Sequence, residues 1–178
     1  MKSVIIGDAG VGKTSFLKAI HQNILPTDYI PTILDYYGKD ITINNSATKL
    51  SIWDTAGREE FGRLRPLSYP QTYVFILCYS ISNSYSFKNI VKKWIPEIKH
   101  YMPGVPFILV GTKSDSEQQV TFKEAERVAK KHRAFSHIVC SALNNFNVKL
   151  VVYTAVKAAL QYQQELKNQL QTRKQCCK

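Results

Sequence analysis

Short apolar runs recur along the chain, separated by segments whose apolar residues return at helical spacing. Ile41 and Ile43 alternate with polar residues, which predicts a half-exposed strand nearer the edge of a sheet, and Asn44-Asn45-Ser46 then predicts a hairpin turn. The other runs are continuous and rich in β-branched or aromatic residues, as is typical of buried strands. These runs cover residues 4–6, 50–53, 73–79, 107–110 and 138–140.

Two helical patterns lie between these runs. Thr121 and Glu124 have the spacing of a capping box, which predicts a helix from there to about His132. Residues 84–100 form another helical pattern, in which Pro96 is expected to distort the second half.

A long C-terminal helix is predicted to begin at Val148. After about Gln161 the sequence becomes rich in Gln and Lys, so we expect this helix to emerge from the body and fray. We therefore assign residues 1–165 to one domain and residues 166–178 to a polar, lipid-bearing tail. The apolar residues that recur at helical spacing are Val151, Val152, Ala155 and Ala159.

The order of the elements predicts an α/β fold. Strands that alternate with helices form a mostly parallel sheet, here six-stranded, with helices on both faces. The 178 residues suit a single domain. No apolar run approaches the ~20 residues of a membrane helix, and the N-terminal run is too short for a signal peptide. We therefore expect a cytoplasmic protein.

The formal net charge of +11 raises the question of a nucleic-acid or membrane partner. The basic residues are scattered, apart from a cluster at residues 130–133, and no nucleic-acid-binding motif accompanies them. Solvated helix faces are therefore favoured over nucleic acid, with weak membrane attraction as a secondary alternative. Cys78 and Cys140 lie in strand-like runs, where a thiol usually behaves as a small buried hydrophobe.

Residues 7–14, Gly-Asp-Ala-Gly-Val-Gly-Lys-Thr, match the phosphate-loop pattern G-x-x-x-x-G-K-[ST] between a strand and a helix-compatible segment. Glycines let backbone N–H groups curl around a polyphosphate, and the helix N-terminus adds partial positive charge. Lys13 is expected to reach the β- and γ-phosphates, and the Thr14 hydroxyl to bind Mg²⁺. The residues assigned to this site are Asp8, Ala9, Gly10, Val11, Gly12, Lys13, Thr14 and Ser15.

Asp54 and Gly57 follow the strand at residues 50–53. An acid at a strand end beside a phosphate loop holds Mg²⁺, often through water. Gly57 can bring its backbone N–H to a γ-phosphate without steric hindrance. Paired with the phosphate loop, these residues indicate a sensor of the γ-phosphate.

The residues that follow the last two strands favour a guanine base. The Asp115 carboxylate can accept two hydrogen bonds from the ring N–H and exocyclic amine of guanine, a pair that adenine does not offer. Lys113 can lay its stem along the base, and the segment Ser141-Ala142-Leu143 can offer a backbone N–H to the guanine carbonyl. With Thr112, these residues predict a GTP/GDP site at the sheet edge where ligands collect, and Asp115 disfavours ATP-dependent phosphoryl transfer.

With these motifs the chain resembles a small GTPase of the Rho/Rac branch of the Ras superfamily. The resemblance implies that Thr32 closes over Mg²⁺ and the γ-phosphate in the GTP state, that Tyr29 joins the nucleotide site, and that residues 32–37 are read by effectors. Trp53 resembles the position that helps Rac-type members choose exchange factors. The segments that carry the resemblance are residues 29–32, 53–57, 63–72, 93–97 and 111–115.

The resemblance implies a monomeric switch that binds GTP or GDP with Mg²⁺. Its implied partners are guanine nucleotide exchange factors, downstream effectors, and GDI and GAP proteins, with a role in actin organisation. The implied location is the cytoplasm and the inner face of the plasma membrane.

Two departures concern the base. Only five residues separate Asp115 from Thr121, so the extra helix that Rho members usually insert there is expected to be missing. Leu25 stands where the family generally has a phenylalanine against the guanine ring. The loss of an aromatic contact weakens base binding by about 0.5–1.5 kcal/mol, which predicts faster nucleotide release.

Two further departures concern hydrolysis, for which the assigned catalytic residues are Lys13, Thr32, Gly57 and Arg58. Ala9 occupies a position normally held by glycine, and its methyl group projects toward the space that a GAP arginine must enter. Arg58 replaces the glutamine that orients the attacking water, and arginine has donors only. Arg58 either donates to the γ-phosphate in cis or points to solvent. In both cases we expect slow, poorly stimulated hydrolysis; the alternative is a GTP-bound or fast-exchanging module with negligible turnover.

The chain ends Gln175-Cys176-Cys177-Lys178, which is not a C-a-a-X box because Gln stands fourth from the end. If the protein extends by a residue or two, either cysteine becomes a prenylation site. Arg173 and Lys174 form a thin basic patch beside it. Membrane anchoring through this segment is therefore an expectation.

Overall fold

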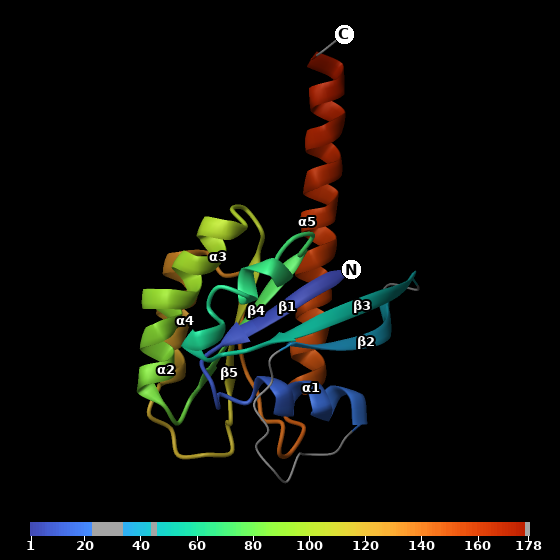
Figure 1. The fold of residues 1–178 in the computed structure, drawn as a ribbon. Coiled ribbons are helices and arrows are strands. Elements are labelled where there is room, and N and C mark those ends of the chain that lie inside the picture. The colour runs from blue at the N-terminus through green and yellow to red at the C-terminus, as the bar shows by residue number, and fades with distance from the viewer. Residues whose placement is uncertain (23–33, 44–45, 177–178) are drawn as a thin grey trace.

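The computed structural model describes residues 1–22, 34–43 and 46–176. A six-stranded sheet runs through the domain in the order β2-β3-β1-β4-β5-β6 (Figure 1). The pairs β1–β3, β1–β4, β4–β5 and β5–β6 are parallel, and β2 pairs with β3 antiparallel. This confirms the predicted α/β fold. The strands are β1 (Lys2–Gly7), β2 (Leu34–Ile43), β3 (Ser46–Thr55), β4 (Val74–Ser80), β5 (Phe107–Thr112) and β6 (Ser136–Val139).

The half-exposed strand predicted around Ile41 and Ile43 is β2, which lies at one edge of the sheet. It pairs with β3 from Leu34 opposite Thr55 to Ile43 opposite Ser46, as a hairpin requires. The two asparagines of the predicted turn lie outside the described residues.

Helices cover both faces of the sheet (Figure 1). The first core lies between the sheet and the pair α1 and α5, and Phe16 and Val151 pack there with Ile5 and Ile76. The second core joins the opposite side chains of the same strands to the remaining helices. Period-two alternation within each strand is what lets one sheet serve two cores. The helices are α1 (Lys13–Gln22), α2 (Ser84–Asn89), η3 (Ile90–Trp94), α3 (Ile95–Tyr101), α4 (Phe122–His132) and α5 (Val148–Cys176), with 3₁₀ turns η1 (Glu59–Phe61) and η2 (Arg65–Ser68).

Both predictions about helix chemistry are confirmed. The Thr121 hydroxyl accepts from the backbone N–H of Glu124, and the Glu124 carboxylate accepts from the N–H of Thr121 at 2.9 Å, which completes a capping box at the start of α4. The helix around Pro96 is distorted, because a π-helical turn, η3, ends just before α3. Proline lacks the N–H for a regular helical bond and its ring excludes the carbonyl one turn back, so a wider turn precedes it.

The C-terminal helix differs from expectation. It leaves the body after about Gln161, as predicted, but it does not fray: α5 is helical for 29 residues, to Cys176 (Figure 1). Gln161 donates to Glu165 at 3.0 Å and Gln164 to Asn168 at 3.1 Å, and such i,i+4 pairs stabilise exposed helices. The segment after residue 165 is thus a helical extension as far as it is described. Across the described residues, we find no helix that combines the length and the apolarity needed to span a bilayer.

No helix lies between Asp115 and Thr121, a stretch that the structure describes completely. The expected absence of the additional Rho-type helix is therefore confirmed.

Candidate functional site

The phosphate loop connects β1 to α1, and its backbone is tightly curled. Gly10 and Gly12 have φ angles of +74° and +95°, a region that favours glycine. Gly7 packs against the next strand so closely that a Cβ atom there would lie 2.1 Å from the Cys78 carbonyl oxygen. Ala9 lies exposed on the rim of the loop, whereas Val11 is buried in the first core, so the loop turns its backbone toward a ligand.

Lys13 extends back over this loop. Its Nζ atom donates to the carbonyl oxygens of Gly7 at 2.8 Å and Asp8 at 2.9 Å. Burial lowers the pKa of Lys13, and the negative charge of Asp54 opposes that shift. The ammonium group is thus held where the predicted β- and γ-phosphates would meet it, as the sequence motif requires.

Thr14 and Asp54 meet beside the loop, although 40 residues separate them. The Thr14 hydroxyl donates to Asp54 Oδ2 at 2.6 Å, and Asp54 is buried at the end of β3. A hydroxyl and a carboxylate are the hard oxygen donors that Mg²⁺ prefers, so these residues fit the ion and would hold it together with phosphate oxygens. Thr32, the third predicted ligand, lies outside the described residues. Within the described ranges no cluster of three His, Cys, Asp or Glu residues suggests another metal site.

Gly57 rests directly on the phosphate loop. A Cβ atom on Gly57 would lie 2.4 Å from the backbone nitrogen of Ala9, so the absence of a side chain is what permits the contact. The backbone after β3 is therefore brought against the phosphate loop.

Arg58 follows Gly57 but does not point to the loop. It forms an ion pair with Glu60 at 3.3 Å, and both side chains are about half exposed. Of the two alternatives for this residue, the described geometry favours orientation toward solvent.

A cavity of about 230 Å³ lies at the predicted base site. Asp115 stands at its edge and accepts a hydrogen bond from the Ser141 hydroxyl, whose oxygen in turn accepts from the backbone N–H of Leu143 at 3.1 Å. Burial raises the pKa of Cys140 to about 12, so its thiol stays neutral and forms an apolar wall. The residues lining the cavity are Gly12, Ser15, Phe16, Thr112, Lys113, Asp115, Cys140, Ala142 and Leu143. Leu25 and Tyr29, also assigned to this site, lie outside the described residues.

The side chains of two residues assigned to nucleotide binding make hydrogen bonds within the protein. The Thr112 hydroxyl donates to the carbonyl oxygens of Val11 and of Tyr79, the latter at 2.9 Å, so it ties the phosphate loop to two strands. The Asp8 carboxylate accepts from Asn89 Nδ2 and Trp94 Nε1, both at 2.7 Å. A carboxylate that pointed into the loop would repel phosphates, and these two donors hold it elsewhere.

Trp94 is the functional residue that sequence reasoning missed. It is fully buried, and the Arg65 guanidinium lies 4.4 Å from its ring. Arg65 in turn donates to the Ala56 carbonyl at 2.8 Å and to both Glu97 carboxylate oxygens at 2.8 and 3.0 Å. The contacts therefore run without a break from the phosphate loop to the segment after β3. The sequence indicates this role only through Asp8, because a carboxylate within a phosphate loop needs a hydrogen-bond donor from another part of the chain.

Comparison with known proteins agrees with this geometry. A family model described as the Ras family matches residues 2–161. The Ras-like GTP-binding protein RhoL of Drosophila melanogaster is 45% identical over 163 residues, which span 89% of this chain and 86% of that protein. These matches confirm the Rho-like resemblance that the sequence motifs predicted.

The contact between Asp8 and Trp94 leads to a test of the phosphate loop. Trp94→Phe keeps an aromatic ring against Arg65 but removes the N–H that Asp8 accepts. We expect the affinity for GDP to fall about tenfold, the worth of one hydrogen bond to a charged group. The affinity for GMP should not change, because GMP lacks the β-phosphate that the loop holds. Competition against a fluorescent nucleotide measures both.

The matched control is Tyr69→Phe, which removes a hydroxyl that donates to Glu97 in the same cluster without touching Asp8. It should leave both affinities as they are. Equal losses for GDP and GMP in Trp94→Phe would indicate general damage to the fold and contradict a role in the loop.

Proposed function

This chain belongs to the Ras family of small GTPases, and on that premise we propose that it is a guanine-nucleotide-dependent switch that hydrolyses GTP slowly. In this proposal it binds GTP or GDP with Mg²⁺ and signals through the residues around Thr32 and the segment after Gly57. Exchange factors and effectors are its proposed partners.

Nucleotide binding is supported at both ends of the site. Lys13 supplies a buried positive charge within a loop of curled backbone, and Thr14 and Asp54 supply oxygen ligands beside it. The cavity at the other end carries Asp115, whose carboxylate can accept both N–H donors of the guanine edge, with Ser141 holding it in place. When bound, Mg²⁺ would neutralise phosphate charge.

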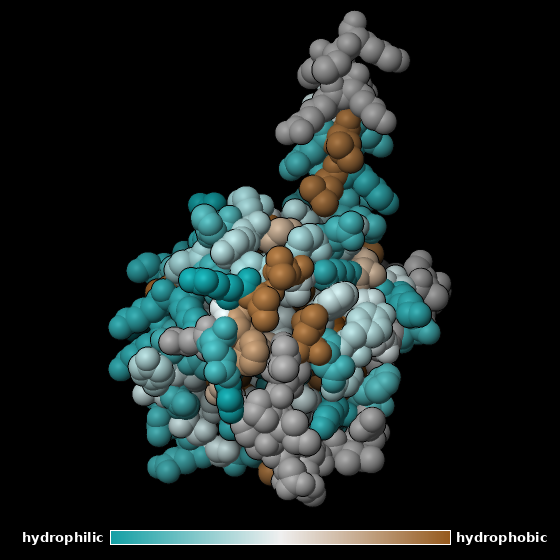
Figure 2. Space-filling view, in the orientation of Figure 1, coloured by the Kyte–Doolittle hydropathy of each residue, from teal (hydrophilic) through white to brown (hydrophobic). Residues whose placement is uncertain are grey.

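Signalling through the switch segments is supported by an apolar surface. A second cavity of about 240 Å³ lies between the start of β2 and the turns η1 and η2. Leu34, Leu64 and Leu67 line it and are at least half exposed. Figure 2, drawn in the orientation of Figure 1, shows hydrophobic side chains gathered at the centre of the face toward the viewer. Exposed apolar side chains next to segments that change with the γ-phosphate can form a binding surface for a partner that distinguishes the GTP-bound from the GDP-bound protein.

The observation that carries slow hydrolysis is the ion pair between Arg58 and Glu60. Attack on the γ-phosphate requires a water that is oriented by an acceptor and a donor together, as glutamine provides. Arg58 has donors only, and its charge is engaged by Glu60 on the solvent side. Ala9 adds a methyl group at the exposed rim where an activating arginine would enter.

Arg58→Gln is therefore expected to accelerate GTP hydrolysis. The single-turnover hydrolysis rate of the GTP-loaded protein should rise about tenfold. This is less than the roughly 10²–10⁴-fold acceleration that a positioned acid or base contributes to a reaction. Glu60→Gln is the control: it releases Arg58 from its ion pair without adding an acceptor, and it should leave the rate unchanged. A faster Glu60→Gln protein with a slower Arg58→Gln protein would instead assign Arg58 a role at the γ-phosphate.

A second candidate is an interaction module that exchanges nucleotide quickly and hydrolyses almost none. Leu25 is the feature that favours it, because an aliphatic side chain replaces the aromatic contact with guanine that the family resemblance implies. Leu25→Phe should then slow the release of fluorescent GDP about three- to tenfold, from the 0.5–1.5 kcal/mol scale of aromatic contacts. An off-rate equal to that of the wild type would rule out Leu25 as the cause of fast exchange.

A further inference from the structure

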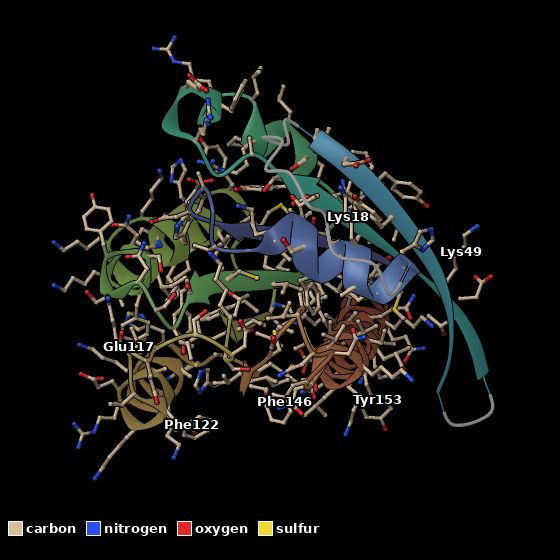
Figure 3. The ribbon with its side chains drawn as sticks, turned by 90° about the horizontal axis from the view of Figure 1, so that it is seen from below. Lys18, Lys49, Glu117, Phe122, Phe146 and Tyr153 are labelled. Atoms are coloured by element: carbon tan, nitrogen blue, oxygen red, sulfur yellow. The ribbon has the colours of Figure 1, made fainter. Side chains whose placement is uncertain are left out.

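The outward side of α5 carries an apolar ridge near the start of the helix. It consists of Phe146, Leu150 and Tyr153, whose exposed fractions are 52%, 47% and 42%. Leu150 and Tyr153 are three residues apart on one side of α5, away from the buried Val151 and Ala155, and Phe146 lies in the turn just before the helix. In Figure 3, which looks along α5, Phe146 and Tyr153 lie together on its outer side. We call these three residues the α5 ridge.

The charged side chains on the chain segment that carries the ridge have one sign. Lys149 precedes Leu150, and the Lys157 ammonium lies 5.6 Å from the ring of Tyr153. The sequence contains no Asp or Glu from Arg127 to Gln164. The exposed side chains of the ridge are apolar and the charged residues beside them are basic. The ridge is therefore complementary to an apolar surface that bears negative charge.

The shape and size of the ridge indicate which kind of apolar, negatively charged surface it can bind. Three half-exposed side chains of at most ~250 Å² each offer less than the ~800 Å² per partner that a stable protein interface buries. The lysines would also repel one another if two copies paired ridge to ridge. A lipid interface, in contrast, accepts protruding aromatic and leucine side chains without a complementary pocket, and anionic headgroups attract the flanking lysines.

We propose that the α5 ridge, with Lys149 and Lys157, docks on an anionic membrane surface. The ridge lies on the core-proximal part of α5, far along the helix from Cys176, so this contact does not require a lipid attached to the chain. It is also separate from the nucleotide site and does not depend on the proposed switch function. The docked protein would lay the outward side of α5 against the headgroups.

The test uses the full chain without lipid modification in a vesicle flotation assay. Vesicles of phosphatidylcholine alone are compared with vesicles rich in phosphatidylserine. The wild type should bind the anionic vesicles about thirtyfold more than the neutral ones, since each of the two lysines near the surface contributes ~1 kcal/mol. Phe146→Ser with Tyr153→Ser should reduce that binding about tenfold or more, because each removes apolar area from the contact.

A matched control is available on α4. Phe122 is 55% exposed, like Phe146, but Glu124 and Glu126 follow it in the same helix. Figure 3 shows it on a different part of the surface. Phe122→Ser should therefore leave vesicle binding unchanged. A second pair, Lys149→Gln with Lys157→Gln, keeps the ridge and should abolish the preference for anionic vesicles.

Three results would overturn the proposal. Wild-type protein that binds neither vesicle, or both equally, would remove the anionic surface as the partner. Ridge variants that still bind anionic vesicles fully would assign the binding to scattered charge. Wild-type self-association that Phe146→Ser with Tyr153→Ser abolishes, in the absence of vesicle binding, would assign the ridge to a second copy of the chain.

Discussion

The phosphate site depends on how closely the loop after β1 can approach the neighbouring strand. Gly7 lies so near the Cys78 carbonyl that any side chain there would collide with it, and Gly57 makes a similar contact with the other side of the loop. These two glycines let the backbone curl between β4 and the end of β3. Lys13 can then reach the loop carbonyls, and Thr14 can meet Asp54. The positions of the charges thus follow from a steric constraint on the backbone.

The negative charge of an acidic residue within an anion-binding loop also has to be balanced by hydrogen-bond donors. Asp8 is held by Asn89 and Trp94, and Trp94 stacks with Arg65, which reaches the backbone of Ala56. Trp94 and Arg65 are buried, which makes their contacts costly to break, because an unpaired polar group in the interior loses its hydration. The cluster therefore couples the loop to the segment that precedes Arg58. Arg58 itself lies outside that cluster, in an exposed ion pair with Glu60.

Local patterns predicted what local forces determine. The continuous apolar runs became the strands β1, β3, β4, β5 and β6, the Thr121–Glu124 spacing became a cap, and the phosphate-loop motif became a curled loop between β1 and α1. Contacts between residues that are distant in sequence could not be predicted: Asp8 and Trp94 are 86 positions apart, and no pattern connects them. The helical extension to Cys176 differs from the predicted fraying because Gln, Lys and Leu are good helix formers even in a polar segment. The roles of Leu25, Tyr29 and Thr32 remain predictions from the sequence.

The central proposal is that this protein binds guanine nucleotide and converts GTP to GDP slowly. The most direct test is chromatography of the nucleotide released from freshly purified protein, repeated over several hours of incubation. The account predicts guanine nucleotide alone, with a substantial GTP fraction at the start that declines slowly to GDP. Adenine nucleotide in the protein, or GTP that is already fully converted at the first time point, would contradict it.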